Sequence, residues 1–193
     1  MQAMAIEEAK YTVLKKEGHL ELRQYAPHIV AETLVESDFE GAGNKAFRRL
    51  FNYISGNNES QQKIAMTAPV SQAVQGEKIA MTVPVGQQKV GKNWAISFMM
   101  PATYTLETLP KPKDTQVYLR QVPTHYVAAI QYSGFWSEKR FMNHKQQLET
   151  WIQAQSLKST GDAIWARYNA PFTPWFLRRN EILVPIDKPI SDQ

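Results

Sequence analysis

The stretch HLELRQYAPHIVAETLV, residues 19–35, sets the pattern from which the fold of this chain is predicted. From His19 to Tyr25 apolar and polar side chains alternate with a period of two, which is typical of a half-buried β-strand. Ala26-Pro27 interrupts the alternation, because proline has no backbone N–H to donate to a sheet. The strand pattern resumes from Ile29 to Val35. The stretch therefore predicts two consecutive strands joined by a tight turn.

After Asp38 the apolar residues recur at helical spacing, at positions i, i+3, i+4 and i+7. This spacing places them on one face and predicts an amphipathic helix. Gly56-Asn57-Asn58 ends the helix, since these residue types tolerate the left-handed backbone region. The apolar positions are Phe47, Leu50, Phe51 and Ile54.

The order of elements repeats after the connector Leu109–Asp114, which is stiffened by two prolines. Each half is predicted as two strands, a helix and two more strands, and the second helix runs from about Ser137 to Gln155. A six-residue connector is too short to separate independent domains, so one α+β domain of two related halves is expected. The remaining predicted strands are Tyr11–Leu14, Trp94–Met100, Val117–Gln121, Tyr126–Tyr132, Ala163–Tyr168 and Asn180–Ile186.

A duplicated octapeptide lies between the first helix and the strand that begins at Trp94. KIAMTAPV at residues 63–70 recurs as KIAMTVPV at residues 78–85. Each copy is apolar and ends near a proline, which predicts two short strands or edge segments with a turn containing Gly76 between them. We expect a hairpin, and a loop over a binding groove is the alternative.

The composition excludes several classes of protein. The 193 residues are 43% hydrophobic and 21% charged, which is typical of a globular chain and excludes disorder. Cysteine is absent, so thiol catalysis, disulfides, iron–sulfur clusters and thioether-linked haem are excluded. A net charge of +4 favours an anionic ligand but is too small to indicate nucleic acid.

Membrane and export signals are not visible in the sequence. No apolar run approaches the roughly 18 residues that a membrane-spanning helix requires. Residues 1–10 contain two acidic side chains and no hydrophobic segment of the kind found in signal peptides. We therefore expect no integral membrane association and a cytoplasmic location.

Enzyme motifs are also missing. The sequence contains no nucleophile elbow, zinc-protease motif, P-loop or dinucleotide fingerprint. The four histidines are too scattered for a structural metal site, yet a single axial ligand to haem iron needs only one of them. His28 follows a turn proline and begins a strand, so it is partly accessible. His144 lies on the apolar face of the second helix, where a packed histidine is the commoner outcome.

Basic residues next to aromatic rings form the clearest binding signal. Lys45, Arg48 and Arg49 flank Phe47 and Phe51 on the first helix. Such a mixture suits a flat apolar ligand with carboxylates, because rings pack against it and cations pair with its acids. The alternative is an ordinary amphipathic helix with a solvated basic face.

A second mixture of this kind occurs near the C-terminus, where Arg178-Arg179 follows Trp175-Phe176. It has a plain structural alternative, an ion pair within the strand between Arg179 and Glu181.

Three long motifs together resemble the SOUL family of haem-binding proteins. They are the duplicated octapeptide, the helix end FRRLFNYISGN at residues 47–57 and the tail YNAPFTPWFLRRNE at residues 168–181. The connector YTLETLPKP at residues 104–112 is similar to the bacterial branch of that family. The resemblance covers about residues 10–187, which we expect to form the haem-binding domain, with 1–9 a leader segment and 188–193 a tail.

The resemblance implies a fold and a ligand. The fold is a distorted antiparallel β-barrel of about eight strands with two flanking helices, built from two pseudo-symmetric halves. The ligand is haem or a free porphyrin, bound without a covalent link in an apolar groove beside the first helix, so the chain would be a carrier, buffer or scavenger. The expected binding residues are Lys45, Arg48, Arg49, Phe47, Phe51 and Asn52.

The same resemblance bears on the iron ligand. Some members of the family carry an iron-ligating histidine at the position of Gln24 in this sequence. His28, four positions later, is the candidate metal ligand here.

Two other functions are compatible with the sequence. One is enzymatic removal of the metal from a tetrapyrrole, with Glu21, Glu32 or a histidine as proton donor. The other is a sensor of small apolar molecules, since similar folds occur in the effector-binding domains of multidrug-responsive regulators.

Overall fold

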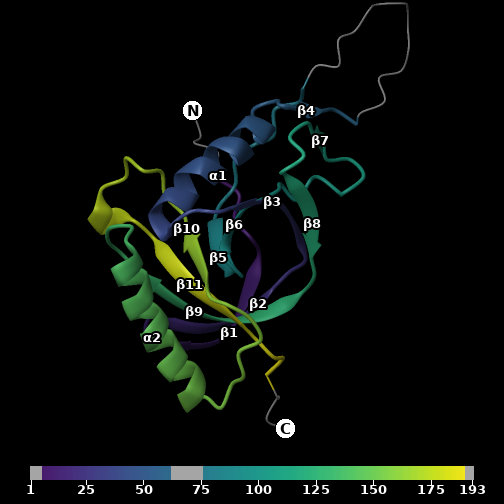
Figure 1. Ribbon diagram of the computed structural model, residues 1–193. Coiled ribbons are helices and arrows are strands. Elements are labelled where there is room, and N and C mark those ends of the chain that lie inside the picture. The colour runs from purple at the N-terminus through teal and green to yellow at the C-terminus, as the bar shows by residue number, and fades with distance from the viewer. Residues whose placement is uncertain (1–5, 62–75, 190–193) are drawn as a thin grey trace, which may run out of the picture.

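A computed structural model describes residues 6–61 and 76–189 of the chain, and in it nine strands form one curled antiparallel sheet (Figure 1). The strand order is β1-β2-β9-β11-β10-β5-β6-β3-β8. Within the described residues the edge strands β1 and β8 do not pair with each other, so the sheet is a half-barrel. Its strands are β1 (Tyr11–Glu17), β2 (Leu20–Tyr25), β3 (His28–Val35), β5 (Val85–Val90), β6 (Asn93–Met99), β8 (Tyr118–Val122), β9 (His125–Tyr132), β10 (Ile164–Arg167) and β11 (Asn180–Ile186).

Two helices and a short two-stranded sheet complete the fold. The helices are α1 (Phe39–Ile54) and α2 (Glu138–Ala154), and the small sheet pairs β4 (Asn58–Glu59) with β7 (Lys111–Pro112). A 3₁₀ turn, Trp175–Leu177, precedes β11. The predicted α+β class, with an antiparallel sheet and two flanking helices, is confirmed.

The sheet contains the two related halves that the sequence predicts. The first half is β2-β3-α1-β5-β6 and the second is β8-β9-α2-β10-β11. Strand β2 pairs with β9 and β8 pairs with β3, so each half adds its first strand to the other half. The halves also meet where β5 pairs with β10.

Local capping explains where α1 begins and ends. The carboxylate of Asp38 accepts a hydrogen bond from the Gly41 backbone N–H at 2.6 Å, as expected of an N-cap residue. Gly56 has a φ of 116°, a conformation that side chains other than glycine's disfavour, and it stops the helix. Of the four apolar residues that the sequence places on one face of this helix, Leu50 and Ile54 are buried, whereas Phe51 is 47% exposed.

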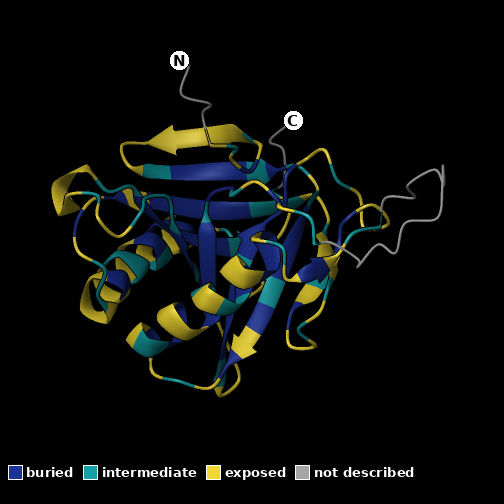
Figure 2. Ribbon diagram, turned by 90° about the horizontal axis from the view of Figure 1, so that it is seen from above, coloured by how far each residue is buried: buried dark blue, intermediate teal, exposed yellow. Residues whose placement is uncertain are grey.

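The helices pack on one face of the sheet, here called the helix face, and the opposite face is called the second face. Figure 2 shows the dark-blue buried strands beneath helices whose outer surfaces are exposed. Residues alternate between the faces along each strand, as in any β-strand. In β11, for example, Ile182 joins the core under the helices, whereas Leu183 joins a smaller cluster on the second face.

A buried ion-pair network lies on the second face. The guanidinium of Arg23 is 2.7 Å from Glu21 and 2.7 Å from Glu181, and Glu181 is fully buried. Arg179 also binds Glu181, at 3.0 Å. The predicted ion pair between Arg179 and Glu181 is therefore confirmed.

The duplicated octapeptide is described in part. Residues 63–70, the first copy, lie outside the described residues, so the predicted hairpin is not tested. The second copy has no regular structure until Val85, where β5 begins. It is nevertheless packed into the fold, because Ile79, Thr82 and Val83 are buried.

Candidate ligand-binding site

An apolar groove of about 220 Å³ lies between α1 and the segment that follows β10. This volume is below the roughly 300–1,000 Å³ that encloses a drug-sized ligand, so the groove can enclose one edge of a large flat molecule. The lining residues are Ile6, Gly43, Asn44, Phe47, Met81, Val83, Val85, Trp136, Arg167, Tyr168, Asn169, Ala170 and Pro171.

Arg167, at the end of β10, brings a positive charge to this groove. Its Nε atom is buried and has no hydrogen-bond partner among the residues that the structure describes. Its Nη2 donates to the side-chain oxygen of Gln87 at 3.4 Å, and no carboxylate among residues 6–61 and 76–189 forms an ion pair with it. Burial lowers the pKa of Arg167 to about 10, so the guanidinium still carries its charge at neutral pH.

The surroundings of Arg167 are rings and small residues. The guanidinium carbon lies 4.8 Å from the ring centre of Trp165 and 5.4 Å from that of Trp136. A Cβ atom on Gly43 would lie 3.2 Å from the terminal nitrogens of Arg167, so the glycine allows α1 to approach the charge closely. The charge is therefore held by the faces of rings and by a neutral amide.

The wall opposite α1 is fixed by a second arginine. Arg178 donates to the carbonyl oxygens of Thr173 at 2.8 Å and Pro171 at 2.7 Å. Its guanidinium also covers the ring of Trp136, 4.5 Å from the ring centre. Arg178 thus holds the loop that lines the groove, and its own donors are engaged in that task.

The structure brings the predicted apolar residues of α1 together. Phe47 lines the groove and stacks on Phe51, with ring centres 5.9 Å apart. Because an α-helix has about 3.6 residues per turn, Phe51 continues the same stripe one turn after Phe47. The exposed ring of Phe51 therefore extends the apolar surface beyond the groove.

The predicted polar residues of α1 do not gather there. Arg49 points toward β3, donates to the hydroxyl of Thr33 at 2.7 Å and pairs with Asp114 at 3.4 Å. Lys45 is exposed and lies two positions from Phe47, roughly 160° around the helix. Arg48 is exposed and only about 100° from Phe47, so it is the predicted cation nearest the groove.

Asn52 is also exposed. It lies five positions after Phe47, roughly 140° around the helix and far from the groove stripe.

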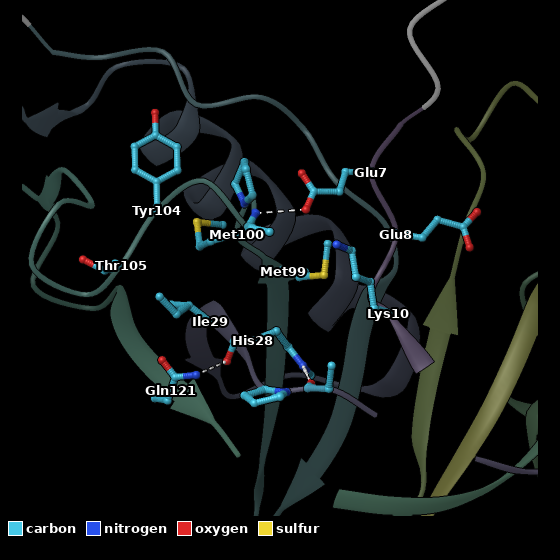
Figure 3. Close-up of a pocket in the computed structure, with 14 residues that line it drawn as sticks. Glu7, Glu8, Lys10, His28, Ile29, Met99, Met100, Tyr104, Thr105 and Gln121 are labelled. Carbon is cyan, nitrogen blue, oxygen red and sulfur yellow. Dashed lines mark hydrogen bonds between the residues drawn. The ribbon is translucent and has the colours of Figure 1, made fainter. Parts of the chain in front are cut away.

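His28 lies on the other side of the sheet. It lines a cavity of about 210 Å³ with Ile29, Met99 and Tyr104, and Figure 3 shows these residues around the cavity. It also lines a cavity of about 290 Å³ on the second face. No residue of α1 lines either cavity, so the structure does not bring His28 to the groove that contains Phe47.

Sequence analysis missed Arg167. The signal was present in the alternation of Ala163–Tyr168, because Trp165 and Arg167 are two positions apart and so share a strand face. A strand that buries Trp165 must direct Arg167 toward the same interior.

The described part of the chain contains no metal site with three or more histidine or carboxylate ligands and no membrane-spanning helix. Residues 6–61 and 76–189 hold no group of three or more histidine, aspartate or glutamate side chains placed to bind a metal ion. No helix within these ranges has the length and apolar character needed to cross a membrane.

Comparison with known proteins identifies the family. The family model described as SOUL heme-binding protein matches residues 6–185, nearly the whole chain. The chain belongs to the SOUL family.

Among SOUL relatives, human heme-binding protein 2 is 28% identical over 178 residues, which cover 85% of this chain and 80% of that protein. Mouse heme-binding protein 1 is 25% identical over 150 residues, covering 77% of this chain and 74% of that protein.

Solved structures share the SOUL-type fold at low sequence identity. A hydrolase from Listeria innocua matches with a TM-score of 0.60 and 13% identity, over 90% of this chain and 94% of that one. The C-terminal domain of EcmrR matches with a TM-score of 0.58 and 10% identity, over 92% and 98%. At these identities the likeness extends to the fold alone.

Proposed function

We propose that this SOUL protein binds haem or a related porphyrin, without a covalent link, in the groove between α1 and the segment after β10. The observation that carries the proposal is the guanidinium of Arg167 in a mostly apolar groove. Its Nε is buried without a hydrogen-bond partner among the described residues, and none of their carboxylates forms an ion pair with it. Haem and porphyrins combine a flat apolar ring with carboxylates, so they match both properties of the groove. The names of the relatives in the family support the same class of ligand.

Electrostatics favour an anionic ligand over a cationic or neutral one. A buried charge without a partner is costly, and a carboxylate can offset that cost by accepting hydrogen bonds from the guanidinium. A lipophilic cation would instead be repelled by Arg167. For the alternative of a sensor of small apolar molecules, this repulsion disfavours ligands that are cations.

The macrocycle would pack against rings on both sides of the groove. Phe47 and Phe51 supply one apolar surface, and Trp136 with Pro171 supplies another. Arg48 at the rim is the nearest exposed cation for a second propionate. We propose that the open groove leaves part of the ring in solvent, which suits a carrier, buffer or scavenger that exchanges its ligand.

Iron ligation by His28 does not fit a macrocycle in this groove, since His28 lines two other cavities that no residue of α1 reaches, and the larger of them lies on the opposite face of the sheet. We therefore propose that haem is held by ring packing and carboxylate pairing. A porphyrin without iron should then bind about as tightly as haem.

The test is a titration of the purified protein with haemin and with protoporphyrin IX, followed by Soret absorbance and by quenching of tryptophan fluorescence. Losing one charged hydrogen-bonded contact costs about 1.5–3 kcal/mol, so Arg167→Met should weaken binding roughly 10- to 100-fold. Lys45→Met is the matched control and should bind as the wild type does. Equal affinities of the wild type and Arg167→Met would refute the proposed site, and no saturable binding by the wild type would refute the function.

A further inference from the structure

A pair of histidines occupies equivalent positions in the two halves of the fold. His28 is the first residue of β3 and His125 is the first residue of β9. Both line the cavity of about 290 Å³ on the second face. Their ring centres are 5.8 Å apart, although 97 positions separate the two residues along the chain. The curl of the sheet therefore brings two turns of different halves together.

The same backbone contact orients each ring. Nδ1 of His28 lies 3.0 Å from the carbonyl oxygen of Ala26, and Nδ1 of His125 lies 2.9 Å from that of Pro123. A carbonyl oxygen only accepts hydrogen bonds, so in the neutral rings the proton sits on Nδ1 and Nε2 carries the lone pair. Neither Nε2 has a hydrogen-bond partner within residues 6–61 and 76–189.

We propose that His28 and His125 together bind one divalent transition-metal ion through their Nε2 atoms. Imidazole nitrogen suits Zn²⁺, Ni²⁺ and Cu²⁺, and Cu²⁺ should bind most tightly. Two imidazoles that bind one ion at about 2.0–2.1 Å place their ring centres roughly 5–6 Å apart at angles near tetrahedral. The observed separation is of that size. A backbone carbonyl that holds the second ring nitrogen is also the usual support for a metal-binding histidine.

Two other residues, Arg120 and Tyr25, bear on the histidine pair. Arg120 faces the same cavity but is paired with Glu32 at 2.8 Å, which reduces its repulsion of a cation. Tyr25 stacks on His125 with ring centres 5.4 Å apart and holds that ring in place, while its hydroxyl accepts from Arg23. Water would complete the coordination, since the described residues supply two ligands.

The experiment is a calorimetric titration of the metal-free full-length protein with Cu²⁺ at pH 7.5, together with electron paramagnetic resonance of the complex. We expect one Cu²⁺ per chain and nitrogen couplings from two imidazoles. His28→Gln and His125→Gln should each weaken binding at least tenfold and remove one imidazole coupling. His19→Gln and His144→Gln are matched controls and should leave the affinity unchanged. Binding should also weaken at pH 5.5, where protons compete for the imidazoles.

Folding of the variants is checked by circular dichroism and by porphyrin titration, because the porphyrin groove lies on the opposite face of the sheet. The proposal is overturned if a folded His28→Gln or His125→Gln binds Cu²⁺ as the wild type does. It is also overturned if the bound ion shows couplings from one imidazole, or if the wild type binds no Cu²⁺ at micromolar concentration. In those cases the two rings only pack against each other.

Discussion

Nη2 of Arg167 lies 3.4 Å from Oε1 of Gln87, and this neutral amide is the guanidinium's one side-chain hydrogen-bond partner in the described part of the chain. Arg23, a buried arginine of the same sheet, is paired differently, since it contacts two carboxylates. The contrast identifies Arg167 as a charge whose partner is not supplied by the described residues. We propose that a carboxylate of the ligand is that partner.

Replacement of Arg167 by methionine should stabilise the ligand-free protein. The substitution removes a buried charge that lacks a carboxylate and keeps an apolar chain of similar length against Trp165. Part of the gain is offset by the lost cation–π contacts, so we expect the free energy of unfolding to rise by about 1 kcal/mol. Urea unfolding of the wild type and the variant measures this change in the free energy of unfolding. A fall of more than about 1 kcal/mol would show that Arg167 is a structural cation and would argue against a role in ligand binding.

Phe51 should matter for binding more than for folding. Its ring is 47% exposed and stacks on Phe47, so Phe51→Ala should change the free energy of unfolding by less than about 0.5 kcal/mol. Loss of its contact with a porphyrin should weaken binding about 2- to 10-fold.

The variant Phe51→Ala is compared with Phe47→Ala, because Phe47 also packs on the buried Phe98, with ring centres 5.2 Å apart. Phe47→Ala should therefore lower both the free energy of unfolding and the affinity for porphyrin. Unchanged porphyrin affinity in a folded Phe51→Ala variant would remove this ring from the site.

His28→Ala should leave the absorption spectrum of bound ferric haem unchanged. The imidazole lines a cavity on the second face, whereas the proposed groove lies on the helix face. Spectra of the haem complexes of wild type and variant, recorded at saturating protein, make the comparison. A shifted Soret band in the variant would place the iron near His28 and on the other side of the sheet.

Stability should fall as the pH drops from 7.5 to 5.5. Burial lowers the pKa of His28 and of His144 below their ordinary value of 6.5. The unfolded chain therefore binds protons at a higher pH than the folded chain does. Stability from these groups is fully present above pH 6.5 and is lost as the pH falls toward their folded-state pKa values.

Urea unfolding at several pH values between 7.5 and 5.5 measures how steeply the free energy of unfolding depends on pH. The double variant His28→Gln, His144→Gln should show a shallower dependence than the wild type. The carboxyl groups whose pKa values are lowered, Glu17, Glu21 and Glu107, titrate below this window and should not contribute. An identical pH dependence in the wild type and the double variant would contradict the assignment of this effect to His28 and His144.

Much of the fold follows from local pattern. Ser137 and Gln155, the expected limits of the second helix, are its N-cap and C-cap residues in the structure. The period of the apolar residues identifies each element as a strand or a helix. Because the order of these elements repeats along the chain, the sequence predicts two related halves. The exchange of β2 and β8 between the halves is set by pairing between distant strands, which local pattern does not encode.

The candidate site could be predicted only in part. Aromatic residues at helical spacing indicate that α1 has a binding face, and Phe47 does line the groove. Which cations share that face depends on how the helix is rotated against the sheet, and this rotation directs Arg49 to Thr33 and Asp114. Arg167 reaches the groove from a strand about 120 positions later, so its role depends on tertiary packing.

The most direct test of carboxylate pairing by Arg167 compares two porphyrins that differ only in their carboxylates. Protoporphyrin IX and its dimethyl ester are titrated, in matched detergent, into the wild type and into Arg167→Met. If Arg167 pairs with a carboxylate, the wild type should bind the free acid at least tenfold more tightly than the ester, and Arg167→Met should bind both with similar, weak affinity. Equal affinity of the wild type for acid and ester, or an unchanged preference in Arg167→Met, would contradict the proposed pairing.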